Sequence, residues 1–507
     1  MPLDGSSDSL KEACGVFAVY GPGQPVAQLT YLGLFALQHR GQEAAGMAVS
    51  DRDTITVVKD QGLVASVFDE RTLAGLAGEL AIGHTRYSTT GSSTWRNAQP
   101  SYRSVGEEEF ALGHNGNLVN TAALAEGAGM LPGTVTSDSD LIAELLAGEL
   151  ERHPGSPNGN GTGHGSVNGN GNAMANAGGS GDPAPKRALE RALLSVLPQL
   201  EGAFSLVLMD EDSVVGVRDP HGFRPLCLGR LNEGWVLASE SPALDIVGAT
   251  FVRELEPGEM VVVDAEGPRS FHPFAADRVD PKLCLFEFVY FARPDTRLYG
   301  RNIHQARVAM GEQLAEQAPA AADMVIGVPE SGVPAAEGFA RRSGIPFGQG
   351  LVKNRYIGRS FIAPSQDKRA QAVRMKLNPL RENIEGKRLV VVDDSIVRGT
   401  TQRQLTKMLR EAGAREVHLR ITSPPVAWSC FYGIDTGVRS ELLAHNLSVE
   451  EIRDYLDVDS LAYLDLDRLV EATGAPAAGF CEACFTGHYP VEVPVELGKH
   501  VLEGASF

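Results

Sequence analysis

Residues 389–401 constrain the fold more than any other stretch of the chain. Four branched apolar residues, 389–392, run without alternation into Asp393 and Asp394. Such a run is typical of a strand that is buried on both faces of a parallel sheet. A loop of mostly small residues follows and leads into a helix-like run over residues 402–412. The stretch therefore predicts a strand, a loop and a helix of an open α/β sheet.

The two acids of this stretch would lie at the carboxyl end of the strand, where open α/β sheets bind ligands. The loop at residues 395–400 would present N–H groups and hydroxyls to a phosphate at the start of the helix. Asp393 and Asp394 would serve ribose-type hydroxyls or Mg²⁺. The alternative is an ordinary buried strand followed by an acidic surface turn. The whole thirteen-residue pattern resembles the phosphoribosyl pyrophosphate (PRPP) motif of type I phosphoribosyltransferases.

The second half of the chain alternates predicted strands with predicted helices. Strands are expected at residues 323–329, 345–352, 389–394 and 416–421, and helices at residues 333–343 and 402–412. This alternation indicates a parallel sheet with crossover helices. The acidic tail at residues 448–473 is expected to be helical.

The first half is patterned differently, with many short strands and few helices. Strands are expected at residues 14–20, 47–49, 54–58, 81–84, 110–114, 203–209, 214–218 and 235–239, a turn and a strand at residues 254–264, and helices at residues 26–38, 141–150 and 186–197. We expect the strand at residues 110–114 to stop at Asn115. Many short strands favour layered sheets over a doubly wound fold.

Residues 153–185 interrupt this pattern with a run rich in Gly, Asn, Ser and Pro. Such a run cannot bury enough apolar surface to offset its ordering entropy, so we expect a disordered insert. The two histidines of the insert raise metal binding as an alternative to solvated low complexity. The expected organisation is a leader at residues 1–13, an α+β domain at residues 14–277 and an α/β domain at residues 278–507.

The composition limits what the chain binds and where it resides. The net charge of −19 and the pI of about 5.1 argue against nucleic-acid and anionic-membrane partners. No apolar run approaches the ~18–20 residues of a membrane span. The polar first 13 residues lack the apolar core of a secretory signal. We therefore expect a soluble cytoplasmic protein that binds anionic substrates through local basic patches or Mg²⁺.

Two stretches of the second half have the residue types of a pyrophosphate site. Glu330, Ser331 and Gly332 lie between a predicted strand and a predicted helix, so their N–H groups would face an anion. Ser331 also offers an oxygen to Mg²⁺, and a helix N-cap serine is the alternative. Residues 353–370, starting at Lys353, hold five basic residues against one acid. A mobile loop of this charge would close over pyrophosphate, with a solvated surface loop as the alternative.

Cys14 stands directly before an apolar run near the start of the first half. A lone early cysteine is usually a small buried residue. Other motifs change this interpretation: LQHRGQE at residues 37–43, GHTRYST at residues 83–89, HNGN at residues 114–117 and TSDS at residues 136–139. Together they resemble the N-terminal-nucleophile class of glutamine amidotransferases, which implies a layered αββα glutaminase domain.

This resemblance also implies a catalytic set. In that class the leader is removed, so that the cysteine becomes the first residue. The free α-amine of Cys14, with a reference pKa near ~8, would then act as the base for its own thiol. Asn115 and the backbone N–H of Gly116 would form the oxyanion hole.

The resemblance implies a binding set for glutamine as well. A zwitterion needs one cation and one anion, and Arg86 would bind the α-carboxylate while Asp138 binds the α-amine. Arg40 and Gly41 would shape the pocket. For Arg86 and Asp138 taken singly, a structural salt bridge is the alternative.

Six cysteines in 507 residues are too few for a disulfide framework, but four of them form a distinct set. The set comprises Cys284, Cys430 and the C-x-x-C pair Cys481 and Cys484. Four thiolates suit structural Zn²⁺ or a [4Fe–4S] cluster, and the nearby His488 leaves a mixed zinc site open. The flanking sequences resemble the iron–sulfur branch of the glutamine PRPP amidotransferases, which implies a structural [4Fe–4S] cluster.

Taken over residues 14–489, the chain resembles the glutamine PRPP amidotransferase (amidophosphoribosyltransferase) family. The resemblance implies transfer of ammonia from glutamine to PRPP in purine synthesis, with an internal ammonia path, a homotetramer and purine nucleotides as feedback inhibitors. It implies Mg²⁺ ligation by Ser331, Asp393 and Asp394. The PRPP-binding residues it implies are Glu330, Ser331, Gly332, Lys353, Asp393, Asp394, Ser395, Arg398, Gly399 and Thr400.

Two other classes remain as alternatives. An amidotransferase of the glucosamine-6-phosphate synthase type would share only the first half, and the motif at residues 389–401 argues against it. A non-catalytic PRPP-sensing regulator would reuse the second half. The intact set around Cys14 and the lack of a recognisable DNA-binding module argue against that class.

Overall fold

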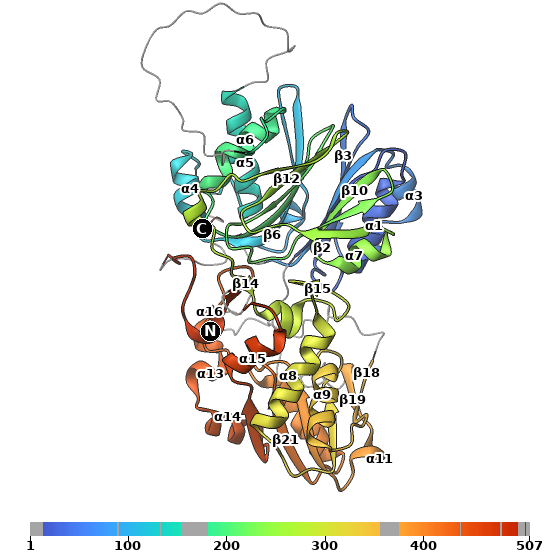
Figure 1. Cartoon of the computed structure of the whole chain (residues 1–507), viewed down its shortest axis with the longest axis vertical. Helices are drawn as coiled ribbons and strands as arrows, with labels where there is room; N and C mark the ends of the chain where they lie inside the picture. Colours follow the sequence, from blue (N-terminus) through green and yellow to red (C-terminus); the bar gives the residue numbers. More distant parts are fainter. Residues whose placement is uncertain are drawn as a thin grey trace, which may run out of the picture. The chain divides into compact units, whose positions relative to one another are not determined.

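Figure 1 shows the computed structural model of the 507-residue chain. It describes residues 14–88, 91–131, 133–153, 181–354, 375–434, 436, 438–476, 479–494 and 502. The predictions for the leader at residues 1–13, for most of the insert and for most of the basic loop lie outside these residues. The described residues form two compact units, which we call the N-terminal unit (mainly 14–239 and 243–281) and the C-terminal unit (240–242 and 282–492).

The N-terminal unit contains two antiparallel sheets. The first has the order β11-β9-β10-β1-β4-β2-β3 and the second the order β13-β12-β8-β7-β6-β5. The first comprises β1 (Gly15–Tyr20), β2 (Ala44–Ser50), β3 (Ile55–Gln61), β4 (Leu80–Arg86), β9 (Cys227–Leu231), β10 (Gly234–Ala238) and β11 (Thr250–Glu254). The second comprises β5 (Ser101–Val105), β6 (Glu108–Leu118), β7 (Gly202–Met209), β8 (Val214–Arg218), β12 (Met260–Asp264) and β13 (Gly267–Phe271).

Helices cover the outer faces of both sheets. α1 (Val26–Ala36), α2 (Val64–Val67) and α7 (Ser241–Ile246) contribute to the core cluster of the first sheet. α5 (Asp138–Arg152) and α6 (Ala188–Val196) contribute to that of the second. Strand β1 shows why the layers form: Phe17 and Val19 pack on the helix side, whereas Val16 and Ala18 pack between the sheets. The predicted αββα layering is confirmed.

The C-terminal unit is built on a parallel sheet of order β17-β20-β21-β22. Its strands are β17 (Met324–Gly327), β20 (Arg388–Asp393), β21 (Glu416–Ile421) and β22 (Ser460–Tyr463). In β20, Val390 and Val392 join one core cluster, and Leu389 and Val391 join another. The strand is therefore buried on both faces, which is why its apolar residues do not alternate with polar ones.

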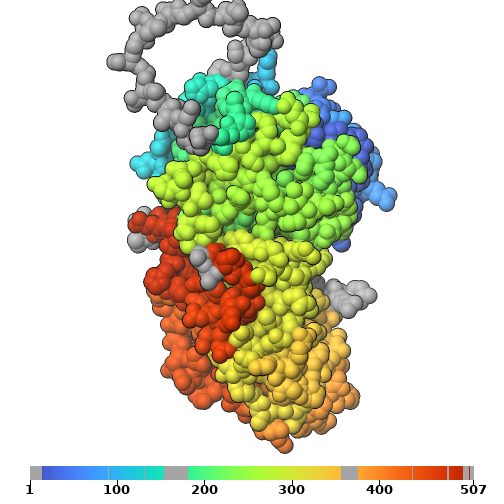
Figure 2. Space-filling view, viewed as in Figure 1, coloured from blue at the N-terminus to red at the C-terminus, as the bar shows by residue number. Residues whose placement is uncertain are grey.

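Helices pack on both faces of this sheet. α8 (Ile303–Gln317), α9 (Val333–Ser343) and α15 (Leu466–Thr473) contribute to one cluster, and α12 (Thr400–Glu411) and α14 (Val449–Leu456) to the other. Figure 2 shows the red C-terminal residues lying beside the yellow residues of α8 on the surface of this unit. The predicted parallel-sheet fold of a type I phosphoribosyltransferase is confirmed.

Short elements complete the chain. Two-stranded pairs form between β14 (Leu283–Cys284) and β23 (Phe480–Cys481), β15 (Arg297–Leu298) and β16 (Arg301–Asn302), and β18 (Leu351–Lys353) and β19 (Leu377–Pro379). The short helices are α3 (Glu70–Ala74), α4 (Thr121–Gly127), α11 (Arg381–Ile384), α13 (Leu443–Asn446) and α16 (Ala483–Thr486). No helix in the described part of the chain has both the length and the apolarity that a bilayer crossing requires.

Three predictions about elements are wrong. The strand expected to stop at Asn115 continues to Leu118, because β7 offers backbone partners along this whole length. The strand expected at residues 345–352 is reduced to a bridge at Phe347 and the start of β18. The tail expected to be helical contains β22, which extends the parallel sheet beside β21.

Candidate active sites

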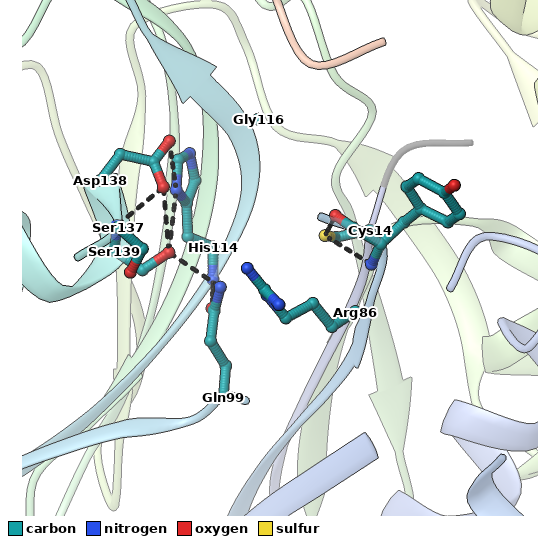
Figure 3. A pocket seen from close by; sticks show the side chains of 9 residues that line it. Cys14, Arg86, Gln99, His114, Gly116, Ser137, Asp138 and Ser139 are labelled. Atoms are coloured by element: carbon teal, nitrogen blue, oxygen red, sulfur yellow. Dashed lines mark hydrogen bonds and ion pairs between the residues drawn. The ribbon is translucent and has the colours of Figure 1, made fainter. Parts of the chain in front are cut away.

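A pocket in the N-terminal unit lies between Cys14, which directly precedes β1, and residues of β4, β6 and the start of α5 (Figure 3). It brings together four residues of the predicted glutaminase set, Cys14, Arg86, Gly116 and Asp138. Its other lining residues are Tyr87, Gln99, His114, Ser137 and Ser139. In Figure 3, Asp138, Ser139 and His114 lie on one side of the pocket, and Cys14 lies on the other with Arg86 between them.

Cys14 is held in place immediately before β1. Its Sγ lies 3.3 Å from both the backbone oxygen and the backbone nitrogen of Tyr87. Arg40, buried to 1% exposure, donates from Nε to the Cys14 carbonyl at 3.2 Å. Burial raises the pKa of the Cys14 thiol to about 11, although the Tyr87 N–H and the charge of Arg86 act in the opposite direction. This thiol needs a base before it can attack as a thiolate.

Asn115 and Gly116 occupy the middle of β6. Asn115 is fully buried, and neither its side-chain oxygen nor its side-chain nitrogen has a partner among the described residues. A buried amide without partners is costly, which makes it a strong candidate for a ligand contact. A Cβ at Gly116 would lie 2.0 Å from the Ala203 oxygen, so only glycine fits at this point.

The charges of the pocket come from Arg86 and Asp138. Asp138 begins α5 and accepts hydrogen bonds from the N–H groups of Ser139 at 2.8 Å and Leu118 at 3.3 Å. Its Oδ2 lies 3.5 Å from Nδ1 of His114. Burial alone would raise the pKa of Asp138, but His114 and the two N–H groups together hold it below its usual range. The pocket thus offers a guanidinium and an ionised carboxylate.

The loop that carries Arg40 packs tightly against β4. A Cβ on Gly41 would lie 2.5 Å from the carbonyl of Thr85 and 2.7 Å from the nitrogen of Arg86. Glycine at this position therefore lets the loop approach the end of the strand that presents Arg86.

Sequence reasoning assigned no roles to Gln99, His114, Ser137 and Ser139. His114, Ser137 and Ser139 belong to the motifs HNGN and TSDS, so their positions carried a signal. Gln99 carried none, because nothing in its sequence surroundings indicates that its side chain reaches the pocket.

The second site is at the end of β20. Asp393 and Asp394 are 7% and 8% exposed, and the Asp394 N–H donates to Asp393 Oδ1 at 2.9 Å. Ser395 Oγ donates to Asp394 Oδ1 at 2.6 Å, and Gln402 Nε2 donates to Asp393 Oδ2. Burial, reinforced by the neighbouring charge of Asp394, raises the pKa of Asp393 well above its usual range. These two carboxyls form a donor set suited to a cation.

Two loops meet beside these acids. Gly399 has a φ of +77°, and Thr400 directly after it starts α12, so the positive end of the helix faces the loop at residues 395–399. A Cβ on Gly332, which precedes α9, would lie 2.5 Å from the Val392 carbonyl. The predicted pyrophosphate loop therefore packs against the end of β20.

Two cations predicted for PRPP binding have carboxylate partners. Arg398 Nη2 lies 2.8 Å from Glu441 Oε2, and Lys353 Nζ lies 3.8 Å from Glu330 Oε2. The remaining basic residues of the 353–370 prediction lie outside the described residues.

The four cysteines of the predicted cluster site come together within the C-terminal unit. Cys284 and Cys481 are paired in the β14–β23 ladder, and Cys484 follows in α16. Burial raises the pKa of Cys484 well above its usual range, and the nearby Cys284, Cys430 and Cys481 raise it further. In the described ranges, no group of three or more His, Cys, Asp or Glu side chains is arranged as a ready metal site. Cys227 is apart from this set, in the core around β9.

The folds and sites define a protein class in which an amide-hydrolysing αββα unit is joined to a phosphoribosyltransferase unit. The family model of the glutamine amidotransferase domain matches residues 182–245. The family model of the phosphoribosyl transferase domain matches residues 301–422.

Whole-chain relatives give the particular family. An amidophosphoribosyltransferase of Mycobacterium tuberculosis is 52% identical over 511 residues, covering 98% of this chain and 90% of the relative. A solved structure described as the allosteric regulatory enzyme of purine biosynthesis has a TM-score of 0.83 and 41% identity, covering 97% and 99% of the two chains. A glutamine PRPP amidotransferase from Bacillus subtilis, complexed with ADP and GMP, has a TM-score of 0.82, 41% identity and the same coverage. The chain belongs to the amidophosphoribosyltransferase family.

Proposed function

We propose that this chain converts PRPP, glutamine and water to 5-phosphoribosylamine, glutamate and pyrophosphate, as the first committed step of purine biosynthesis. The family membership supports a pentosyltransferase with a glutamine amidotransferase domain. The observation that carries the residue assignments is the fully buried, partnerless amide of Asn115, whose two neighbours in β6 line a pocket that also contains Cys14, Arg86 and Asp138.

Removal of residues 1–13 prepares the nucleophile in this proposal. The thiol of Cys14 has a pKa of about 11, so its own thiolate is scarce at neutral pH. A free α-amine at Cys14, with a reference pKa of about 8, would take the thiol proton. The sulfur then attacks the glutamine Cδ, and the proton leaves on the departing ammonia as the γ-glutamyl thioester forms. Water hydrolyses the thioester and releases glutamate.

The oxyanion of each tetrahedral intermediate would be bound by the side-chain N–H of Asn115 and the backbone N–H of Gly116. Both residues lie in β6, so their positions are fixed by the ladder to β7. Arg86 would hold the α-carboxylate and Asp138 the α-amine, while Arg40 and Gly41 maintain the pocket wall. The opposite charges of the pocket match the glutamine zwitterion.

The end of β20 is the proposed PRPP site. The loop at residues 395–400 would receive the 5′-phosphate, and Asp393 and Asp394 the ribose hydroxyls. Glu330, Ser331 and Gly332, with Lys353 and the basic loop, would receive pyrophosphate. When bound, Mg²⁺ would neutralise the charge of the departing pyrophosphate, and the raised pKa of Asp393 supports a cation partner for the acids together with Ser331.

We assign a structural [4Fe–4S] cluster to Cys284, Cys430, Cys481 and Cys484. The chemistry of the donor set supports this assignment, because Cys484 lies near enough to Cys284, Cys430 and Cys481 for these thiols to raise its pKa. Iron and sulfide analysis of anaerobically purified protein tests the assignment. Stoichiometric zinc without iron would contradict it.

Several broader assignments belong to the same proposal. The proposed domains are 14–277 for glutamine hydrolysis and 278–507 for PRPP, and their mutual boundary lies close to residue 282, where the main part of the C-terminal unit begins. The Bacillus subtilis relative complexed with ADP and GMP supports feedback by purine nucleotides. We also propose a cytoplasmic homotetramer.

The decisive experiment compares glutamine and ammonia as nitrogen sources in wild type and Cys14→Ala. We expect Cys14→Ala to lose glutamine-dependent product and to keep ammonia-dependent product at raised pH, where free NH₃ is available. Cys227→Ala is the matched control, because Cys227 is a buried cysteine of the same unit that does not line the pocket.

Three other outcomes would contradict the proposed function, each in a different way. Loss of both activities by a folded Cys14→Ala chain would contradict the division into two sites. A wild-type chain that hydrolyses glutamine without consuming PRPP would indicate another amidotransferase. A chain that binds PRPP without either activity would indicate a regulator.

A further inference from the structure

The backbone around Gln99 is fixed on several sides. Lys59 of β3 donates from Nζ to the carbonyls on either side of it, Ala98 at 2.6 Å and Pro100 at 3.2 Å. A Cβ on Gly46 of β2 would lie 2.2 Å from the Gln99 carbonyl oxygen, so the two backbones are in close contact. Gln99 is 5% exposed and lines the pocket. Its side chain therefore enters the pocket from a rigid base.

The carboxamide of Gln99 joins two elements of the pocket. Its Oε1 accepts the backbone N–H of His114 at 2.7 Å, and its Nε2 donates to Ser139 Oγ at 2.8 Å. His114 immediately precedes Asn115 and Gly116 in β6, whereas Ser139 immediately follows Asp138 in α5. One side chain thus connects the strand of the proposed oxyanion hole with the helix that carries the α-amine ligand (Figure 3).

The hydrogen bond from Gln99 determines which hydrogen bonds Ser139 can donate. Because Gln99 Nε2 donates to Ser139 Oγ, the hydroxyl proton of Ser139 is free for another acceptor. Ser139 Oγ lies 3.4 Å from Asp138 Oδ1 and 3.4 Å from His114 Nδ1. The backbone of His114 is also held from the opposite side, where His84 Nε2 lies 2.9 Å from its carbonyl oxygen. The chain Gln99–Ser139–Asp138 thus adds a side-chain hydrogen bond to the backbone N–H groups and the imidazole that already hold this carboxylate.

We propose that Gln99 is a positioning residue for glutamine hydrolysis, whose carboxamide sets the carboxylate of Asp138 relative to the strand of the oxyanion hole. This inference rests on the proposed function. Gln99 touches neither the reacting atoms nor the nucleophile in this role. It acts by fixing where the substrate α-amine is bound relative to Asn115 and Gly116.

The substitution Gln99→Glu tests this role because it changes hydrogen-bond direction at nearly constant shape. The introduced carboxylate still accepts from the His114 N–H, but it no longer donates to Ser139. Ser139 would then turn its hydroxyl to the new carboxylate and away from Asp138. We expect the KM for glutamine to rise about tenfold or more, with a smaller fall in kcat, because a hydrogen bond that orients a charged ligand is lost.

The pH dependence of the KM distinguishes this positioning role from a merely structural one, because the introduced carboxyl can be protonated. A protonated carboxyl donates one hydrogen bond and so restores the donor that Ser139 requires. The charged or titratable groups that line the pocket with it are Asp138, His114, Arg86 and Cys14, with Lys59 holding the adjacent backbone. We expect the ratio of variant to wild-type KM to fall as pH is lowered. Asn120→Asp, an amide-to-acid change at a side chain that also accepts one backbone N–H and donates one hydrogen bond but lies outside the pocket lining, should show no such trend.

A double-mutant cycle completes the test. If Gln99 acts through Ser139, the effects of Gln99→Glu and Ser139→Ala on the KM for glutamine are not additive. The KM of the double variant for glutamine should then be no higher than the higher KM of the two single variants. Ammonia-dependent transfer, measured on the same preparations, reports whether the rest of the chain is folded.

The outcomes separate this inference from the proposed function. A wild-type chain without glutamine-dependent transfer would refute the proposed function itself. An active wild type with a KM change below about twofold in Gln99→Glu, or with fully additive effects in the cycle, would overturn only the role of Gln99.

Discussion

At the scale of single residues, burial determines the reactivity of the Cys14 thiol. Its thiol pKa of about 11 predicts slow alkylation in the full chain at neutral pH. Because only the thiolate reacts, the alkylation rate should rise about tenfold per pH unit between about pH 7 and pH 10. Short pulses of iodoacetamide followed by peptide mass spectrometry measure this rate at Cys14 alone.

The same measurement on the chain without residues 1–13 provides the comparison. A free α-amine with a pKa near ~8 would move the rise to lower pH. A rate that already levels off near pH 8 in the full chain would contradict the raised pKa.

Glu211 is a second residue whose environment predicts a pH effect. Partial burial, reinforced by the charge of Asp210, raises its pKa from 4.5 to about 7. The folded chain therefore binds more protons than the unfolded chain between these values. The stability that this group contributes is complete below about pH 4.5 and is lost as pH rises through about 7.

Glu211→Gln should therefore raise the unfolding temperature at pH 8, by a few degrees at most because the side chain is partly solvated. At pH 4.5 the variant and wild type should unfold alike. The new amide oxygen still accepts the Glu109 N–H, which Glu211 accepts at 3.1 Å. Glu233→Gln, at a side chain that is 94% exposed, is the control for charge removal alone. Equal stabilisation at both pH values would argue against the raised pKa.

The positions of candidate residues were predictable where short motifs carry them, and their roles stay predictions. Cys14 and Asp138 line one pocket, and Asn115 lies in β6 between two of its lining residues, His114 and Gly116. Gln99 was not predictable, since a side chain that acts through hydrogen bonds to other side chains leaves no spacing pattern. The Arg398 guanidinium donates to Glu441, a partner 43 residues away in the sequence that no local pattern indicates, and its role at PRPP stays a prediction.

At the scale of elements, the helices and strands that were predictable are those with a strong local sequence signal. β20 and α12 follow directly from a continuous apolar run and the helix-like run behind it. β22 was missed because its first three residues are only partly buried, so the acidic helical signal around it dominated. The continuation of β6 through Asn115 depends on its pairing with β7, which is a long-range contact without a local signal.

The packing of α8 on α9 gives a prediction at this scale. A Cβ on Gly338 would lie 1.9 Å from the Val308 carbonyl oxygen, and a Cβ on Gly311 would lie 1.8 Å from that of Ala335. Gly338→Ala should therefore destabilise the C-terminal unit by about 1–3 kcal/mol, the usual cost of overpacking. Denaturant unfolding measures this cost.

Gly148 of α5 is the matched helical control, because a Cβ there has no neighbour within 4 Å. Gly148→Ala should be neutral or stabilising by up to about 1 kcal/mol, since alanine is the better helix former. Destabilisation of both variants to the same degree would show that the close approach of α8 and α9 is not the cause.

At the scale of the whole molecule, the two units have separate cores but carry out consecutive steps of the proposed reaction. Ammonia released into neutral solution is mostly protonated and diluted, which makes it a poor nucleophile. A nitrogen handed on within one chain keeps a high effective concentration at the acceptor. We therefore predict that ammonia derived from glutamine does not equilibrate with solvent before it reaches PRPP.

An ammonia-consuming dehydrogenase, added in excess with its keto acid and reduced nicotinamide cofactor, tests this prediction. Product formed by wild type from glutamine should fall by less than about twofold, because the trapped pool is not the one that reacts. Product formed by Cys14→Ala from ammonium salts should disappear under the same conditions, which shows that the trap is effective. If the wild-type product also disappears, the two units exchange ammonia through bulk solvent and the internal path is refuted.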